Sequence, residues 1–191
     1  RYKLILASGS PRRKFLLETA GLDFEIKKNE VNESYPEGLE IDKIAEYLAR
    51  KKASGNKSLL QKDELLLTAD TMVAFMGKEY GKPENKEHSI QMLCALGGQI
   101  HTVFTGVCIS DGERLESFSV KSRVKFDKID ESEASWYYDN FKPVDKAGSY
   151  GIQDWIGYCK VEWIEGSYTN ILGLPLTQTL KALKSFIESH H

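Results

Sequence analysis

The chain has 191 residues, and its 26 lysines and arginines nearly balance its 28 aspartates and glutamates, which gives a net charge of −2. This balance does not favour nucleic acid or an anionic membrane as a partner, so any anion binding has to come from local basic clusters. The length fits one domain over residues 1–191, and no apolar run is long enough to span a bilayer.

Apolar periodicity and turn residues predict that strands and helices alternate in the first part of the chain. Strands are predicted over residues 4–7, 24–28 and 65–69, and a further strand over 72–75 leads into a hairpin turn at Gly77. Helices are predicted from Pro11 to Gly21 and from Ile41 to a stop at Ser54-Gly55, with a polar loop over 29–38 before the second helix. Asp70 and Thr71 are expected to interrupt the strands on either side of them.

The second part of the chain continues the alternation, and it contains no linker or internal repeat. Asn85 is predicted to cap a helix that reaches Leu96, and Asp130 with Glu133 resembles a capping box for a helix to about Phe141. Strands are expected over 101–110 and 114–126, on either side of an Asp111-Gly112 turn, and over 159–164. The last helix is expected over 175–187, with Leu176, Leu180, Leu183 and Ile187 as its apolar stripe. One α/β domain with a mixed sheet and flanking helices is the simplest architecture.

A strand, a turn and a helix start meet at the run Ser8-Gly9-Ser10-Pro11-Arg12-Arg13. Ser10 is a good N-cap and Pro11 fits the first helical position. Unpaired backbone N–H groups and the positive end of the helix dipole would then lie beside two arginines, so phosphate is the expected ligand. An ordinary capped helix with surface arginines is an equally good interpretation of this run alone.

Two charged residues occupy positions where apolar ones are expected. Lys52 follows Ile41 by eleven residues, which returns it to within roughly 20° of the apolar stripe of its helix. It therefore points inward, where it either extends past the helix end to solvent or meets a buried anion. Asp70 ends an apolar strand, where its carboxylate caps the following turn, binds a cation or accepts a proton from water.

Together with weaker candidates, these residues fit nucleoside triphosphate hydrolysis. Arg12, Arg13, Lys52 and Lys82 can neutralise phosphate, while Asp70 and Glu33 can hold a divalent metal or activate water. Glu33 lies in a polar loop, so a solvated surface acid is its default interpretation. The chain has no Gly-x-x-x-x-Gly-Lys-Ser/Thr, Gly-x-Gly-x-x-Gly or Gly-x-Ser-x-Gly motif, which argues against a Walker-type ATPase, a dinucleotide-binding fold and a serine hydrolase.

Six motifs in order resemble the Maf family across nearly the whole chain. They are Ser8-Gly9-Ser10-Pro11-Arg12-Arg13, Leu48-Ala49-Arg50-Lys51-Lys52-Ala53, Ala69-Asp70-Thr71, Gly81-Lys82-Pro83, the run from Asp145-Lys146-Ala147-Gly148 to Gln153, and Gly173-Leu174-Pro175. The resemblance implies an inosine-triphosphatase-like fold, an elongated mixed sheet in two lobes with flanking helices and a central cleft. It also implies a nucleotide pyrophosphatase that cleaves between the α and β phosphates and needs a divalent metal.

The resemblance also implies a role for each matching residue. Asp70 would accept the proton of the attacking water, and Glu33 would help Asp70 to place the metal, with Mg²⁺, Mn²⁺ and Co²⁺ all suitable. The phosphates would be held by Arg13, Lys52 and Lys82, with further contacts from Ser8 and Ser10. A homodimer is frequent in the family, but the oligomeric state stays open because no self-complementary stripe requires it.

Three positions separate the branches of that family. Arg12, Thr71 and Gln153 resemble the branch that acts on dTTP and UTP, and a glutamine amide can both donate to and accept from the edge of uracil or thymine. Asp154-Trp155 departs from the smaller residues expected there, with Trp155 either stacking near the base or filling the contact between lobes. A pyrophosphatase for 7-methyl-GTP or another modified nucleotide, and a non-catalytic nucleotide-binding regulator of cell division, are the alternatives.

The remaining features concern the compartment and the chain ends. A chain of this length needs no disulfide framework, and its three cysteines form no Cys-x-x-Cys pair, which disfavours metal binding. We therefore expect buried thiols in a reducing compartment. The N-terminus shows no signal-peptide pattern, which favours a soluble cytoplasmic protein. We interpret residues 188–191, which end in His190-His191, as the remnant of a tag and base no function on them.

Overall fold

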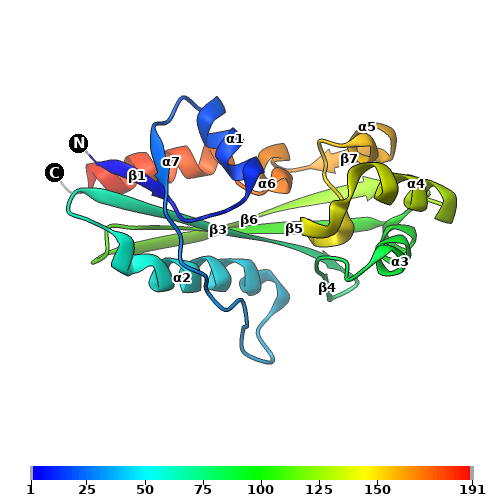
Figure 1. Cartoon of the computed structure of the whole chain (residues 1–191), viewed down its shortest axis with the longest axis horizontal. Coiled ribbons are helices and arrows are strands. Elements are labelled where there is room, and N and C mark those ends of the chain that lie inside the picture. The colour runs from blue at the N-terminus through cyan, green and yellow to red at the C-terminus, as the bar shows by residue number, and fades with distance from the viewer. Residues whose placement is uncertain (1, 190–191) are drawn as a thin grey trace. The chain divides into compact units, whose positions relative to one another are not determined.

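The computed structural model in Figure 1 describes residues 2–189. His190 and His191, on which the tag interpretation rests, lie outside the described residues. Within the described part, seven strands form a mixed sheet in the order β2-β1-β3-β5-β6-β7, and β4 pairs with β3. The predicted α/β class is therefore confirmed.

The strands and helices have the following bounds. The strands are β1 (Lys3–Leu6), β2 (Phe24–Ile26), β3 (Glu64–Phe75), β4 (Lys78–Tyr80), β5 (Ile100–Ser110), β6 (Leu115–Phe126) and β7 (Val161–Glu165). The helices are α1 (Pro11–Thr19), α2 (Ile44–Asn56), α3 (Lys86–Leu96), α4 (Glu131–Phe141), α5 (Trp155–Cys159), α6 (Tyr168–Leu172) and α7 (Leu176–Glu188).

The chain divides into two compact units. Unit 1 comprises Arg1–Asp70, Thr105–Val120 and Gly173–His191, and unit 2 comprises Thr71–Phe104 and Lys121–Leu172. Strands β3, β5 and β6 contribute residues to both, and the division passes through β3 directly after Asp70.

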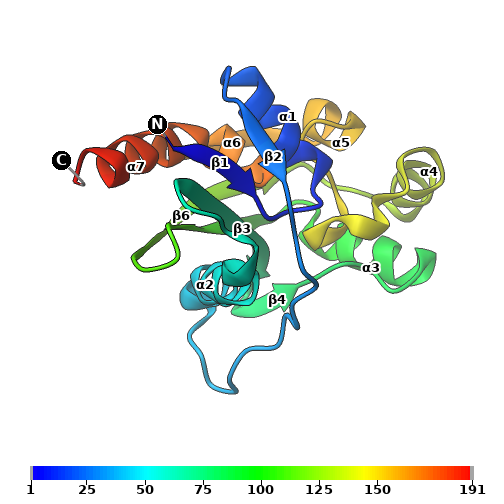
Figure 2. The same ribbon diagram turned by 60° about the vertical axis from the view of Figure 1, so that its left-hand side comes forward.

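In unit 1, small residues allow α2 to lie close against the sheet. Ala49 and Ala53 pack with Ile5, Ala7, Leu66 and Cys108 in one buried cluster. A Cβ atom on Gly106 of β5 would collide with the backbone of Ala45, so only glycine permits this approach. Figure 1 and Figure 2 show α2 on one face of the unit 1 strands and α7 on the other. The position of α2 determines where Lys52 points.

The apolar stripe predicted for the last helix is confirmed for Leu183, is half-buried at Leu176 and Ile187, and is wrong for Leu180. The buried residues of α7 are Thr179, Leu183 and Phe186, while Leu180 is 36% exposed. The Thr179 hydroxyl donates to the Pro175 carbonyl at 2.9 Å, so this polar residue can face the core with its hydrogen bond made inside the helix.

The helix caps predicted in unit 2 are confirmed. The Asn85 side chain accepts from the His88 N–H, and Asp130 with Glu133 forms the predicted capping box.

His101 packs against Phe126 and Tyr150, and its Nε2 lies 2.5 Å from the Tyr150 hydroxyl. Burial lowers the pKa of His101 to about 3, so the ring stays neutral at neutral pH.

Three predicted element boundaries are wrong. Strand β3 continues through Asp70 and Thr71 instead of stopping there, and Cys159 ends helix α5 instead of starting a strand. Helix α2 continues through Gly55, because this glycine is needed for packing and not for termination. A Cβ atom at Gly55 would lie 2.5 Å from Val31 Cγ2 of the preceding loop.

The cysteines are free, as expected, but they differ in burial. Cys108 is buried and Cys94 is half-buried, whereas Cys159 is exposed, so the prediction of three buried thiols is wrong for Cys159. None of the helices within residues 2–189 has the length and apolar character needed to cross a membrane.

Candidate active site

The turn after β1 is built by two serine side chains. The Ala7 N–H continues the pairing with β3 by donating to the Leu67 carbonyl at 3.0 Å, and the buried Ser8 follows. Ser8 Oγ accepts from the Ser10 N–H and from Arg13 Nη1, each at 3.2 Å. Ser10 Oγ accepts from the Arg13 N–H at 3.4 Å, which confirms the predicted N-cap of α1.

Arg13 is an interior residue of unit 1 and not a surface arginine. Its side chain is held by Ser8 and by the Gly173 carbonyl, to which Nε donates at 2.7 Å, and the residue is only 9% exposed. Burial lowers the pKa of Arg13, and the nearby carboxylate of Asp70 opposes that shift. Arg12 is half-buried, and its positive charge contributes to lowering the pKa of Arg13. The interpretation of this run as a cap with surface arginines is therefore wrong for Arg13.

Helix α2 and strand β3 bring Lys52 to Asp70. Thr68 and Asp70 share one face of β3 because side chains alternate along a strand, and Thr68 Oγ1 donates to the Ala49 carbonyl of α2 at 2.7 Å. Lys52 lies one helical turn after Ala49, so its side chain projects from the same face. Its Nζ is 2.6 Å from Asp70 Oδ1, and the two side chains are 17% and 12% exposed. The inward lysine thus meets a buried carboxylate.

Glu33 reaches the same ammonium group from the loop before α2. Its Oε1 is 2.9 Å from Lys52 Nζ, although the Glu33 side chain is 55% exposed. The loop, which Figure 2 shows running from β2 to α2, is fixed to the helix by Lys51 Nζ, which donates to the Ser34 carbonyl at 2.6 Å. Lys52 therefore bridges two carboxylates that are far apart in the sequence.

A lysine that was not predicted lies beside the Ser8–Ser10 turn. A Cβ atom on Gly9 would be 3.1 Å from Lys28 Nζ, so the ammonium group lies directly over this glycine. Lys28 also pairs with the exposed Glu30 at 3.0 Å, whereas Lys27 is bound to Glu64 at 2.9 Å. Consecutive side chains of an extended segment point to opposite sides, so Lys27 and Lys28 are expected to have different partners. This alternation after the strand is the sequence signal that could have identified Lys28.

The other predicted site residues belong to unit 2. Thr71 is half-buried in β3, and Lys82 is exposed. The Gly148 N–H donates to the Gly81 carbonyl at 3.1 Å, which places the residue before Lys82 beside the 145–150 turn. Gln153 Oε1 is buried and has no hydrogen-bond partner among the described residues. The structure therefore brings Ser8, Ser10, Arg13, Glu33, Lys52 and Asp70 together within unit 1, while Thr71, Lys82 and Gln153 belong to unit 2.

Comparison with known proteins identifies the family. A family model described as Maf-like protein matches residues 3–186. The chain belongs to the Maf family. A Maf relative from Bacteroides thetaiotaomicron, named dTTP/UTP pyrophosphatase, is 47% identical over 185 residues, which cover 96% of each chain. A relative of the same name from Porphyromonas gingivalis is 44% identical and covers 100% of this chain and 97% of its own.

Among solved structures, this Maf chain is similar to the Staphylococcus aureus Ham1 protein. The similarity has a TM-score of 0.48 at 14% sequence identity, and it covers 65% of this chain and 71% of that one.

The donor set of unit 1 fits a hard divalent cation that also binds phosphate. No group of three or more His, Cys, Asp or Glu residues within residues 2–189 could hold a metal by itself. Magnesium in phosphate-processing sites commonly uses one or two carboxylates, with the remaining ligands from phosphate and water. Asp70 and Glu33 are the two carboxylates that could supply those ligands, and one oxygen of each lies within hydrogen-bond distance of the same lysine nitrogen.

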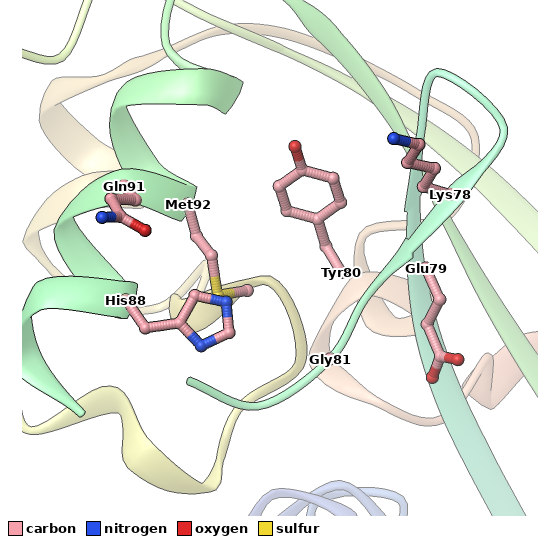
Figure 3. A pocket seen from close by; sticks show the side chains of 7 residues that line it. All are labelled: Lys78, Glu79, Tyr80, Gly81, His88, Gln91 and Met92. Carbon is pink, nitrogen blue, oxygen red and sulfur yellow. The ribbon is translucent and has the colours of Figure 1, made fainter. Parts of the chain in front are cut away.

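The Maf chain also has a pocket in unit 2 that includes none of the predicted site residues. Figure 3 shows its walls, strand β4 and the residue after it on one side and helix α3 on the other. Its volume is about 340 Å³, and it is lined by Lys78, Glu79, Tyr80, Gly81, His88, Gln91 and Met92. The Glu84 N–H donates to His88 Nδ1 at 3.2 Å. Among the residues that line the pocket, Gly81 is adjacent in sequence to a predicted site residue, Lys82.

Proposed function

We propose that this Maf protein hydrolyses dTTP and UTP to the nucleoside monophosphate and pyrophosphate, as a nucleotide diphosphatase. The observation that carries the proposal is the cluster of Lys52 with Asp70 and Glu33 beside the buried Arg13. Such a cluster combines a proton acceptor with fixed positive charge, which are the two requirements for water attack on a phosphate anhydride. The names of the two relatives give the substrate class.

In this proposal, Asp70 accepts a proton from the water that attacks the α-phosphorus. The bond between the α-phosphorus and the oxygen that bridges it to the β-phosphorus breaks, and pyrophosphate leaves with that oxygen. Arg13, Lys52 and Lys82 bind phosphate oxygens, and Ser8 and Ser10 add hydroxyl and backbone contacts at the turn. Lys28, whose ammonium lies over Gly9, adds positive charge at the same turn.

Asp70 and Glu33 would hold the divalent metal, for which Mg²⁺, Mn²⁺ and Co²⁺ are all suitable. A cation bound there would neutralise phosphate charge and polarise the phosphorus towards attack. Lys52 would then keep both carboxylates turned towards the phosphates while it contacts a phosphate oxygen itself.

Arg12, Thr71 and Gln153 select the base in this proposal. The buried and unpartnered Oε1 of Gln153 supports that role, because a buried acceptor without a donor is costly unless a ligand supplies one. The N3–H of uracil or thymine is such a donor. A location in the cytoplasm and one Maf-like domain over residues 1–191 belong to the same proposal. The family resemblance adds a homodimer as one of the oligomeric states to test.

The decisive experiment is product analysis of the purified chain with canonical and modified triphosphates, each with Mg²⁺, Mn²⁺ or Co²⁺ and with a chelator. We expect dTMP or UMP with equal amounts of pyrophosphate, no reaction with chelator, and the label of ¹⁸O-water in the monophosphate. Release of orthophosphate would contradict the proposal. A strong kcat/KM preference for 7-methyl-GTP would show that the substrate is a modified purine nucleotide instead of dTTP or UTP. Tight nucleotide binding without release of pyrophosphate would favour a non-catalytic regulator.

A further inference from the structure

A buried tyrosine holds the turn that carries Gln153. Tyr137 of α4 is fully buried, and its hydroxyl accepts the Gly151 N–H at 3.0 Å while it donates to Asp154 Oδ2 at 2.9 Å. One side chain thus joins the residue two before Gln153 to the residue after it. Burial raises the pKa of Tyr137, so the hydroxyl keeps the proton that it donates.

The space around Gly151 explains why these contacts concern Gln153. A Cβ atom at Gly151 would lie 2.7 Å from Asp154 Oδ2 and 3.0 Å from Gln153 Oε1. The carboxylate that Tyr137 binds and the carboxamide of Gln153 therefore converge over the same glycine. Lys146 Cε also lies 3.0 Å from that position.

Base recognition by a glutamine needs this kind of support. A carboxamide presents a donor and an acceptor side by side, and rotation by 180° exchanges them. Uracil and thymine offer an acceptor at O4 and a donor at N3, whereas cytosine offers a donor at N4 and an acceptor at N3. A glutamine free to rotate would accept both kinds of base, so discrimination depends on the residues that fix its orientation.

We propose that Tyr137 and Asp154 are positioning residues that fix the carboxamide of Gln153 and thereby make the site select uracil and thymine over cytosine. Tyr137 restrains Gly151 and Asp154 on the two sides of Gln153, and Asp154 and Gly151 define the space in which the carboxamide lies. This proposal rests on the proposed function, to which it adds residues that determine the choice of base.

The test measures kcat and KM of the full chain for dTTP, UTP, dCTP and CTP. Tyr137→Phe keeps the ring and removes both hydrogen bonds, and we expect the ratio of kcat/KM for dTTP to that for dCTP to fall about fivefold. Most of the change should appear in KM, because the phosphate-binding residues are untouched. Tyr138→Phe is the matched control, since the side chain of this neighbour on α4 contacts Lys142 through its ring, which the substitution keeps.

A second pair of variants separates positioning from a loss of stability. Asp154→Ala removes the acceptor of the Tyr137 hydroxyl, whereas Asp154→Asn keeps an acceptor oxygen of the same size. We expect Asp154→Ala to lose discrimination and Asp154→Asn to retain most of it. If Tyr137→Phe and Asp154→Ala lower Tm but leave the dTTP to dCTP ratio at its wild-type value, the role is structural only and the proposal is overturned.

Failure of the proposed function would look different. A wild-type chain that binds dTTP but releases no pyrophosphate would overturn that function. The ratio of Kd values for dTTP and dCTP, measured for the same variants, would still decide the positioning role.

Discussion

The two units concentrate polar groups in different ways. In unit 1 the groups of the cluster are charged: Lys52 lies between Asp70 and Glu33, and Arg13 donates to the Gly173 carbonyl. In unit 2 the amide oxygen of Gln153 is neutral, buried and without a hydrogen-bond partner among the described residues, and a tyrosine hydroxyl binds the residues on either side of it. Charge suits the phosphates, which every nucleotide shares, and a neutral amide suits the base, which differs. The comparison predicts that the cluster of Lys52, Asp70 and Arg13 in unit 1 determines the rate and that the turn of Gln153 in unit 2 determines the choice of base. Arg12 of unit 1 and Lys82 of unit 2 are the two proposed site residues outside this division.

The largest effect is expected from Asp70→Asn, which removes the proton acceptor but keeps the size of the side chain. We expect kcat to fall by about 10³-fold for dTTP and dCTP alike, because general-base catalysis contributes on that scale. The ratio of kcat/KM between the two bases should not change, and the Kd for dTTP should stay within a few-fold of wild type. Rapid-quench product analysis and calorimetric titration measure these quantities.

Asp42→Asn is the control for that variant, since Asp42 is half-exposed and paired with Lys43 outside the cluster. Near-wild-type turnover in Asp70→Asn would remove Asp70 from the reaction. A change in base preference without a change in rate would reverse the assignment of the two units.

The second effect concerns the ammonium group that two carboxylates share. Lys52→Gln leaves Asp70 and Glu33 facing each other without the charge between them, and it removes a phosphate ligand. We expect kcat/KM to fall by about 10²-fold for every nucleotide, with the base ratio unchanged. The same substitution at the exposed Lys57 should have no effect on turnover. Equal activity of both variants would show that the ion pair with Asp70 is structural.

These residues differ in how far the sequence reveals them. The inward direction of Lys52 follows from helix geometry alone, because eleven residues return nearly to the same face of a helix. The capping residues Ser10, Asn85 and Asp130 act within three residues of their own position, and all three caps are present. Helix caps and hairpin turns depend on residues only a few positions apart, which is why both can be predicted from the sequence.

The errors arise where a distant partner decides the outcome. Asp70 and Thr71 look like a break between strands, but the strand continues because Lys52 on α2 compensates the buried charge of Asp70. Gly55 looks like a helix stop, but its place is determined by Val31 in the preceding loop. For Tyr137 no role was predicted, because nothing near it in the sequence shows that its hydroxyl binds Gly151 and Asp154.

The smallest effect is expected at Lys28, and it tests how far the charged region of unit 1 extends. Its ammonium lies over Gly9 but remains half-exposed and paired with Glu30, so solvent screens much of its attraction for phosphate. We expect Lys28→Gln to raise KM about threefold for dTTP and dCTP equally, with kcat unchanged, since exposed charges contribute on that scale. The increase should disappear in 0.5 M salt, where the KM values of wild type and variant would converge.

Lys184→Gln on α7 is the control, because Lys184 is equally charged and pairs only with Glu188 among the ion pairs of the described residues. A KM that is unchanged at low salt would limit the phosphate-binding charge of unit 1 to Arg13 and Lys52, and a larger effect on dTTP than on dCTP would mean that Lys28 acts on the choice of base, as proposed for Arg12.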